Sequence, residues 1–297
     1  MISLCQYEYI DSNQPVFKVN KSINGGFMVR SEGERLTRVI VCSPKKEYTC
    51  VTNLKEHNIT ELANGKMALL QHDELTTKIK DFRCQIIDLT ELENHPNSVF
   101  TRDTSLCTPE GYIKLRLGIK SRLGEEEWMA QSLDSMGIPC AGIIKAPGTV
   151  DGGDIVLAGQ VAFIGKTTRT NEEGINQLAG MLKKMDYEIR VIPLPDSILH
   201  LDKALMLVNQ RQILYCSDLV PQKFLSSFDL IEIVTSTTTT ANIICLGDNE
   251  VIVSKQNYEV IQVLEEKNFI VHTLDLSEFV KGTGGPNCLI MPIERKD

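Results

Sequence analysis

The sequence lacks any long apolar run. Its most apolar stretches, such as 143–144 and 204–208, are far shorter than the roughly 20 residues of a membrane-spanning helix, so no membrane partner is expected. Basic residues do not outnumber acidic ones: the chain has 31 Lys and Arg and 39 Asp and Glu, which gives a formal net charge of −8. An acidic chain has no bulk attraction to phosphate backbones, which argues against nucleic acid as a partner.

The N-terminal residues 1–15 contain no basic end followed by an apolar segment. No signal peptide is therefore predicted, and a cytoplasmic protein is expected. Hydrophobic residues make up 42% and charged residues 24%, the balance of an ordinary globular protein. No linker interrupts the chain, so residues 1–297 are predicted to form one catalytic α/β domain. The Thr237–Thr240 run is the only low-complexity patch, and the sequence assigns it nothing beyond a surface loop.

Motifs for metals, disulfides and nucleotides are also missing. The nine cysteines include no CxxC pair and have no His at ligand spacing, so neither a metal site nor a disulfide framework is predicted. The glycine pairs at 152–153 and 284–285 match neither GxGxxG nor a P-loop, so no nucleotide or other cofactor is expected. Eight cysteines are interpreted as reduced structural residues. Cys288 is considered separately.

Short β-branched runs alternate with helical segments along the chain. Strands are predicted at 38–43, 84–89, 112–117, 143–146, 187–192 and 269–274, and hairpins at 154–165, 204–216 and 242–254. Helices are predicted at 122–136, at 170–185 with Thr170 or Asn171 as the cap, from Pro221, and at 256–267. The helix starts near 122, 170 and 221 lie about 50 residues apart, which favours a radial or stacked array over one doubly wound sheet.

Several polar residues stand beside predicted strands and turns. If the segment before the strand at 204–208 is extended, His200 and Asp202 face one side, because side chains alternate along a strand. Asp103 is predicted to stand at the end of a short apolar strand, and Asp151 and Asp154 bracket a glycine pair. Each feature alone is equally consistent with a structural interpretation without chemistry, namely a solvated turn or an exposed strand edge. Together with Cys288 they fit a planar cation such as a guanidinium, which pairs bidentately with carboxylates and is attacked by a thiolate.

The order of these motifs resembles the guanidino-group-modifying superfamily, which comprises arginine deiminases, dimethylarginine dimethylaminohydrolases and amidinotransferases. The motifs that carry the resemblance are PNSVFTRDT (96–104), KSRLGEEE (120–127), DGGD (151–154), TTRTNEEG (167–174), HLD (200–202), AN (241–242) and GGPNC (284–288). They follow the family's order over about 190 residues. The resemblance implies a pentein fold, a five-fold pseudo-symmetric α/β propeller of ββαβ-type units with its site at the centre.

The resemblance also implies catalytic roles for residues in these motifs. Cys288 is expected to be the nucleophile and His200 the general acid and base, with Asp151 holding His200. Asp103 and Asp202 are expected to bind opposite edges of the guanidinium.

Further residues are expected to bind the rest of the substrate. Arg122 and Arg169 resemble the family's clamps on the α-carboxylate. Asn97 stands where the dimethylarginine hydrolases have a carboxylate that helps bind the α-amino group. Phe100 and Asn242 lie in the carrying motifs and are expected to line the substrate site.

The motifs mix features of several branches of the superfamily. Arg102 stands where the dimethylarginine hydrolases have an acidic residue, and HLD resembles deiminases or amidinotransferases. The chain length, the RTN segment and the AN motif resemble the dimethylarginine hydrolases, and the large helical insertion of arginine deiminases is missing.

Three functions therefore stay open. The first is hydrolysis of a guanidinium C–N bond of arginine or a methylated arginine to citrulline, the second is amidino transfer to an amine, and the third is guanidine binding without turnover. The implied partner is a small guanidino compound. The oligomeric state is open, with a homo-oligomer among the alternatives.

Overall fold

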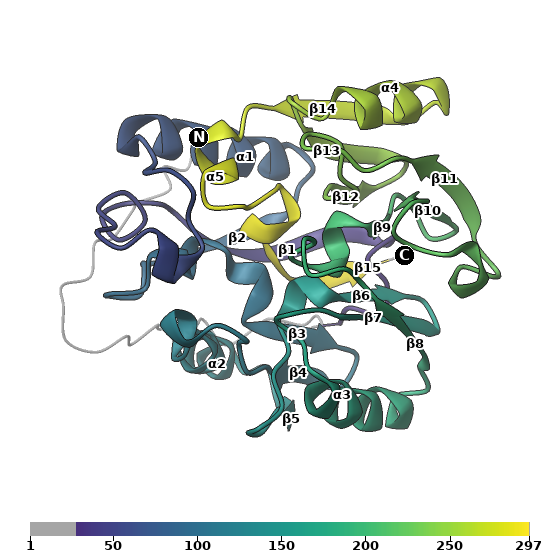
Figure 1. Ribbon diagram of the computed structural model, residues 1–297, viewed down its shortest axis with the longest axis horizontal. Coiled ribbons are helices and arrows are strands. Elements are labelled where there is room, and N and C mark those ends of the chain that lie inside the picture. The colour runs from purple at the N-terminus through teal and green to yellow at the C-terminus, as the bar shows by residue number, and fades with distance from the viewer. Residues whose placement is uncertain (1–27, 297) are drawn as a thin grey trace, which may run out of the picture.

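Five three-stranded sheets make up the protein in the computed structural model, which describes residues 28–296 (Figure 1). The expectations for Met1–Pro15, including Cys5, lie outside these residues. The sheets are β15–β1–β2, β3–β4–β5, β6–β7–β8, β9–β10–β11 and β12–β13–β14. Their strands are β1 Arg35–Cys42, β2 Gln85–Leu89, β3 Ser105–Thr108, β4 Gly111–Lys114, β5 Cys140–Ile143, β6 Ile155–Ala158, β7 Val161–Lys166, β8 Glu188–Pro193, β9 Leu205–Leu207, β10 Gln212–Cys216, β11 Asp229–Ile233, β12 Ile244–Gly247, β13 Glu250–Ser254, β14 Ile270–Leu274 and β15 Met291–Lys296.

Every sheet repeats one pairing pattern. Its first strand runs antiparallel to the middle strand, and the middle strand runs parallel to the third. The C-terminal strand β15 pairs with β1 and so completes the unit that the N-terminal strands begin. The five-fold α/β arrangement that the resemblance implies is therefore confirmed.

The helices lie around the outside of the sheets (Figure 1). A helix connects the middle strand to the third strand in four units: α1 Gly65–Asp81, α2 Glu125–Ser135, α3 Glu172–Lys184 and α4 Tyr258–Glu266. In the β9–β10–β11 unit the connection holds only a 3₁₀ turn, Gln222–Phe224. A short helix, α5 Ser277–Val280, precedes β15. No helix of the described part of the chain is long and apolar enough to cross a membrane.

Burial falls from the first strand to the third strand of each unit. The first strands β3, β6, β9 and β12 are buried at every position, whereas the third strands β2, β5 and β14 are partly exposed. β15 contacts β3, and β6 contacts β9, so the first strands surround the centre of the ring. The centre of the protein is therefore built from strand segments that are far apart in the sequence.

Several predicted elements differ from the structure. Helix α1 was not predicted from the sequence, because polar Gln71 and His72 are buried on it while apolar Leu69 and Leu70 are exposed, which hides the helical pattern. Strands β3, β11 and β15 were not predicted either. The strand predicted at 143–146 is β5 at 140–143, and the helix predicted from 122 begins at 125.

Short 3₁₀ turns stand immediately before four of the first strands. They are Thr101–Asp103 before β3, Gly152–Asp154 before β6, Leu201–Lys203 before β9 and Asn287–Leu289 shortly before β15. Two sequence expectations were therefore wrong locally: Asp103 precedes a strand instead of ending one, and Asp202 lies in a turn instead of an extended segment. Since the first strands converge, their preceding turns meet at one end of the ring.

Candidate active site

These turns surround a small inner pocket. Seven of the predicted site residues line it: Asn97, Phe100, Asp103, Arg122, Arg169, His200 and Cys288. Three do not line it: Asp151 and Asp202 lie behind His200 and Cys288, and Asn242 lines a larger neighbouring chamber. The sequence-predicted residues thus come together although they span almost 200 positions.

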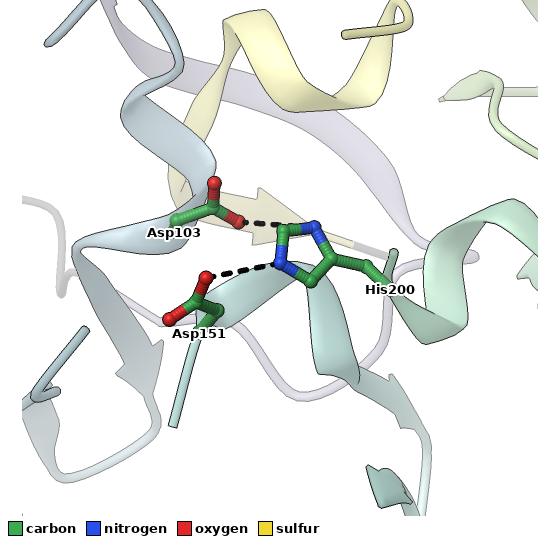
Figure 2. Close-up of side chains that lie close together, drawn as sticks. All are labelled: Asp103, Asp151 and His200. Carbon is green, nitrogen blue, oxygen red and sulfur yellow. Dashed lines mark hydrogen bonds and ion pairs between the residues drawn. The ribbon is translucent and has the colours of Figure 1, made fainter. Parts of the chain in front are cut away.

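His200 lies between two carboxylates (Figure 2). Its Nε2 is 3.0 Å from Oδ2 of Asp151, and its Nδ1 is 3.7 Å from Oδ1 of Asp103. Burial lowers the pKa of His200, but the charge of Asp103 and the hydrogen bond of Asp151 outweigh it and raise that pKa to about 9. The imidazole is therefore protonated at neutral pH and can give up a proton.

Asp103 carries a permanent negative charge at the same pocket. Its Oδ2 accepts a hydrogen bond from Nη1 of Arg122 at 2.5 Å, and its Oδ1 accepts one from the backbone N–H of Gly153 at 3.0 Å. Burial raises the pKa of Asp103, but the charges of His200 and Arg122 prevail and lower it to about 2. An ionised carboxylate at this position suits a cationic ligand.

Arg122 is fixed by protein acceptors on every side. Its Nε and Nη2 donate to Oε2 of Glu125 at 2.9 and 2.7 Å, and Nη2 also donates to the Phe100 carbonyl at 3.0 Å. The side chain is only 4% exposed. In this structure its hydrogen bonds therefore hold Asp103, and its expected contact with a substrate carboxylate stays a prediction.

Arg169 is held less tightly than Arg122. Its Nη1 is 3.8 Å from Oδ2 of Asp151, and its side chain is 11% exposed. It lines both the inner pocket and the larger chamber beside it. A carboxylate entering the pocket from that chamber would meet this guanidinium.

Cys288 lines the inner pocket, and polar groups surround its sulfur. Nδ2 of Asn242 donates to its Sγ at 3.4 Å, and Oδ2 of Asp202 lies 3.8 Å from the same sulfur. Burial and the charge of Asp202 raise the pKa of Cys288 to about 12. Cys288 is therefore a thiol in the unliganded protein, and a bound cation would favour its thiolate.

Asp202 has one oxygen engaged and one without a partner. Its Oδ2 accepts from Nδ2 of Asn287 at 3.1 Å, whereas its Oδ1 is buried and meets no hydrogen-bond donor within residues 28–296. Oδ1 of Asn97 is also buried without a partner in that part of the chain. Unpaired buried acceptors are costly, so their presence here points to a ligand that donates hydrogen bonds.

Both glycine pairs allow backbone to approach the site closely. A Cβ on Gly153 would lie 2.7 Å from Nδ1 of His200, and one on Gly285 would lie 2.4 Å from Oδ1 of Asn242. Neither position tolerates a side chain.

Some residues with site contacts were not singled out from the sequence. Glu125 anchors Arg122, and its spacing of three residues on a helix start was the available signal. Asn287 holds Asp202 and directly precedes Cys288. Arg102 was named from the sequence but given no contact; it pairs at 2.8 Å with Glu32, which was not singled out, and no sequence signal connects residues 70 positions apart.

Asp154 has a supporting place. It accepts hydrogen bonds from the hydroxyls of Thr167 and Thr170 at 2.7 and 2.6 Å and from the N–H of Leu201 at 2.9 Å. It thereby ties the turn that carries His200 to the loop that carries Arg169.

The ligand atoms of Asp103, Asp151 and His200 all lie within 4.8 Å of one another, a grouping that could hold a metal ion. A metal-bound imidazole nitrogen must be free of its proton. Because the pKa of His200 is raised to about 9, a proton competes with any metal at this position. The imidazolium itself balances the two carboxylates.

Comparison with known proteins places the chain in a family. The sequence model of the family described as N,N dimethylarginine dimethylhydrolase, eukaryotic, matches residues 45–295. The chain belongs to this family. The N(G),N(G)-dimethylarginine dimethylaminohydrolase of Pseudomonas aeruginosa is 31% identical over 223 residues, which cover 75% of this chain and 87% of that protein.

Solved structures agree on the fold. A crystal structure of a dimethylarginine dimethylaminohydrolase adduct with 4-chloro-2-hydroxymethylpyridine matches with a TM-score of 0.74 and 27% identity, covering 86% of this chain and 99% of that one. The amidinotransferase SxtG of Microseira wollei matches with a TM-score of 0.75 and 18% identity, covering 92% of this chain and 98% of that one. The protein is a pentein.

Proposed function

We propose that this protein hydrolyses a guanidinium C–N bond of L-arginine, or of an arginine methylated on its terminal nitrogens, to give citrulline. The observation that carries the proposal is the position of His200, 3.0 Å from Asp151 and 3.7 Å from Asp103, in the pocket that Cys288 also lines. Membership of a family named for dimethylarginine hydrolysis supports the hydrolytic reaction. The partner is thus a small guanidino compound.

The first half of the reaction forms a covalent intermediate. Asp103 and Asp202 bind the guanidinium, and this positive charge offsets the effect of Asp202 on Cys288, so that the thiol releases its proton to solvent. The thiolate attacks the guanidinium carbon, and a C–S bond forms. His200 gives its proton to the departing nitrogen, and ammonia or a methylamine leaves as the C–N bond breaks.

The second half releases the product. Neutral His200 takes a proton from water, and the resulting hydroxide adds to the thiouronium carbon. The C–S bond then breaks, the added hydroxyl gives its proton to the departing sulfur and so restores the Cys288 thiol, and the neutral ureido group of citrulline remains. Asp151 steadies the imidazole through both halves at its 3.0 Å contact.

The experiment that tests this proposal separates hydrolysis from amidino transfer. In water labelled with heavy oxygen, arginine or a methylarginine alone is expected to yield citrulline with one label and no ornithine, as mass spectrometry would show. Added glycine or lysine is expected to change neither rate nor product. If ornithine forms only when an amine is supplied, the protein is an amidinotransferase and the hydrolase proposal is wrong. If the guanidines bind without turnover, the protein is a guanidine-binding protein without activity.

A further inference from the structure

A larger cavity, the outer chamber, adjoins the inner pocket. Its volume is about 770 Å³, against about 20 Å³ for the inner pocket. Five residues line both cavities: Asn58, Arg169, Leu199, Thr283 and Gly284. The inner pocket has room for little more than a water-sized group, whereas the chamber lies in the range of small-molecule sites. Parts of a substrate that extend beyond the inner pocket therefore lie in the chamber.

The walls of the chamber are rich in hydroxyl and amide groups. They come from the loops that follow β7, β8, β11 and β13 and include Thr168, Ser197, Thr237, Thr240, Gln256 and Asn257. The threonine run is anchored there, since Thr239 donates to Glu259 at 3.0 Å and Asn257 donates to the Thr240 carbonyl at 2.8 Å. Such walls suit a polar ligand with several hydrogen-bonding groups.

The charged groups of the chamber are mainly cationic. The charged residues that line it are two cations, Arg169 and Lys203, and one acid, Asp196. Within residues 28–296 the Lys203 ammonium makes no hydrogen bond or ion pair. Burial and Asp202 raise the pKa of Cys288 while Lys203 opposes them, so this ammonium lies within electrostatic reach of the reacting sulfur. An anionic group in the chamber would find Lys203 free to bind it.

We infer that the outer chamber is a subsite for an arginine acylated on its α-amino nitrogen by a group that carries a second carboxylate, which Lys203 binds. The inference rests on the proposed function and deepens it. Arg169 at the shared border would bind the α-carboxylate, which must then be free, so the extension starts from the nitrogen. The hydroxyl walls would meet the amide and the polar chain between the two carboxylates.

The test compares two isosteric peptides, N-acetyl-Asp-Arg and N-acetyl-Asn-Arg, with free arginine. They differ only in the charge of one side chain. For the unmodified protein, kcat/KM for ureido formation is expected to be roughly tenfold or more higher with the Asp peptide, the size of one charge-assisted contact. It is also expected to exceed the value for free arginine.

Variants connect this preference to Lys203. Lys203→Gln is expected to bring the ratio between the two peptides below about threefold, whereas Lys203→Arg keeps it. Lys223→Gln, at an exposed lysine outside the chamber, is the matched control and should leave the ratio unchanged. Thermal unfolding verifies that each variant is folded, and Lys203→Met, which also removes the charge, takes the place of the glutamine variant if the latter does not fold.

Three results would overturn the inference: equal turnover of the two peptides, a ratio that Lys203→Gln leaves intact, or free arginine as the best substrate. If neither these three guanidines nor a methylarginine yields a ureido product, the proposed function itself fails and the inference fails with it. The two failures are distinguishable. If only the inference fails, a ureido product still forms from arginine or a methylarginine; if the proposed function fails, none forms.

Discussion

The Arg122 guanidinium donates to Asp103 at 2.5 Å while Glu125 holds its opposite edge at 2.7 and 2.9 Å. Asp103 in turn faces Nδ1 of His200 at 3.7 Å. Charges of alternating sign therefore run from the first turn of α2 to the predicted general acid. Glu125, which does not line the inner pocket, thus holds the guanidinium that binds Asp103.

We predict that Glu125→Gln lowers kcat/KM by roughly tenfold or more, because breaking a buried ion pair costs about 3–5 kcal/mol and loosens Arg122. Burial raises the pKa of Glu125 to about 7 although Arg122 opposes it. The wild-type profile of kcat/KM against pH is thus expected to fall below pH 7, and the variant's remaining activity should lack this limb. Glu127→Gln, two residues along on the exposed face of α2, is the control, and equal effects of the two variants would contradict the prediction.

Cys288→Ser is expected to abolish turnover while arginine binding persists. A serine hydroxyl stays protonated at neutral pH even beside a cation, whereas the volume of the side chain hardly changes. Calorimetric titration measures the binding and product assays the turnover. Activity above a few per cent of wild type would refute the assignment of the nucleophile.

Asp202→Asn should make the Cys288 thiol easier to deprotonate but should weaken binding of the guanidinium. Removing the charge 3.8 Å from Sγ is expected to lower the pKa of the Cys288 thiol, which ultraviolet thiolate absorbance follows. Loss of the guanidinium pairing should nevertheless lower kcat/KM by roughly 30- to 4,000-fold, from about 2–5 kcal/mol. A loss below threefold would mean that Asp202 does not bind the guanidinium.

Arg169→Ala tests the carboxylate clamp. Agmatine lacks the α-carboxylate and should be a poor substrate for the wild type, and the variant should lose arginine turnover while its agmatine turnover hardly changes. Steady-state kinetics with both compounds give the comparison. A wild type that prefers agmatine would contradict the role assigned to Arg169.

His200 is expected to make stability depend on pH. Its pKa is raised from 6.5 to about 9 on folding, so it stabilises the protein fully below pH 6.5 and loses this effect as pH rises through about 9. The contribution is on the order of 3 kcal/mol, since one pKa unit corresponds to about 1.4 kcal/mol. Urea unfolding of wild type and His200→Gln should show the difference shrinking over this range, and a constant difference would argue against a raised pKa.

Local patterns predicted much of the secondary structure. The Asn171 cap is present, with its side chain accepting from the Gly174 N–H, and the three predicted hairpins form as β6–β7, β9–β10 and β12–β13. The strands at the ring centre were harder to predict. β15 takes its antiparallel partner β1 from the other end of the chain, which no local pattern encodes, and α1 buries polar residues that hide its apolar face.

The sequence by itself determined the repeating units and the set of chemical groups, because both depend on spacing and residue type along the chain. It also placed Cys288, His200 and the aspartates in recognisable motifs. Only the tertiary structure decided which groups meet, since ring closure by β15 brings turns from different units together. In the folded protein Arg122 binds both Asp103 and Glu125, and Asp202 lies beside the sulfur of Cys288. The threonine run lines the outer chamber. The physical reason is that burial and charge pairing act through space, over distances that have no counterpart in sequence separation.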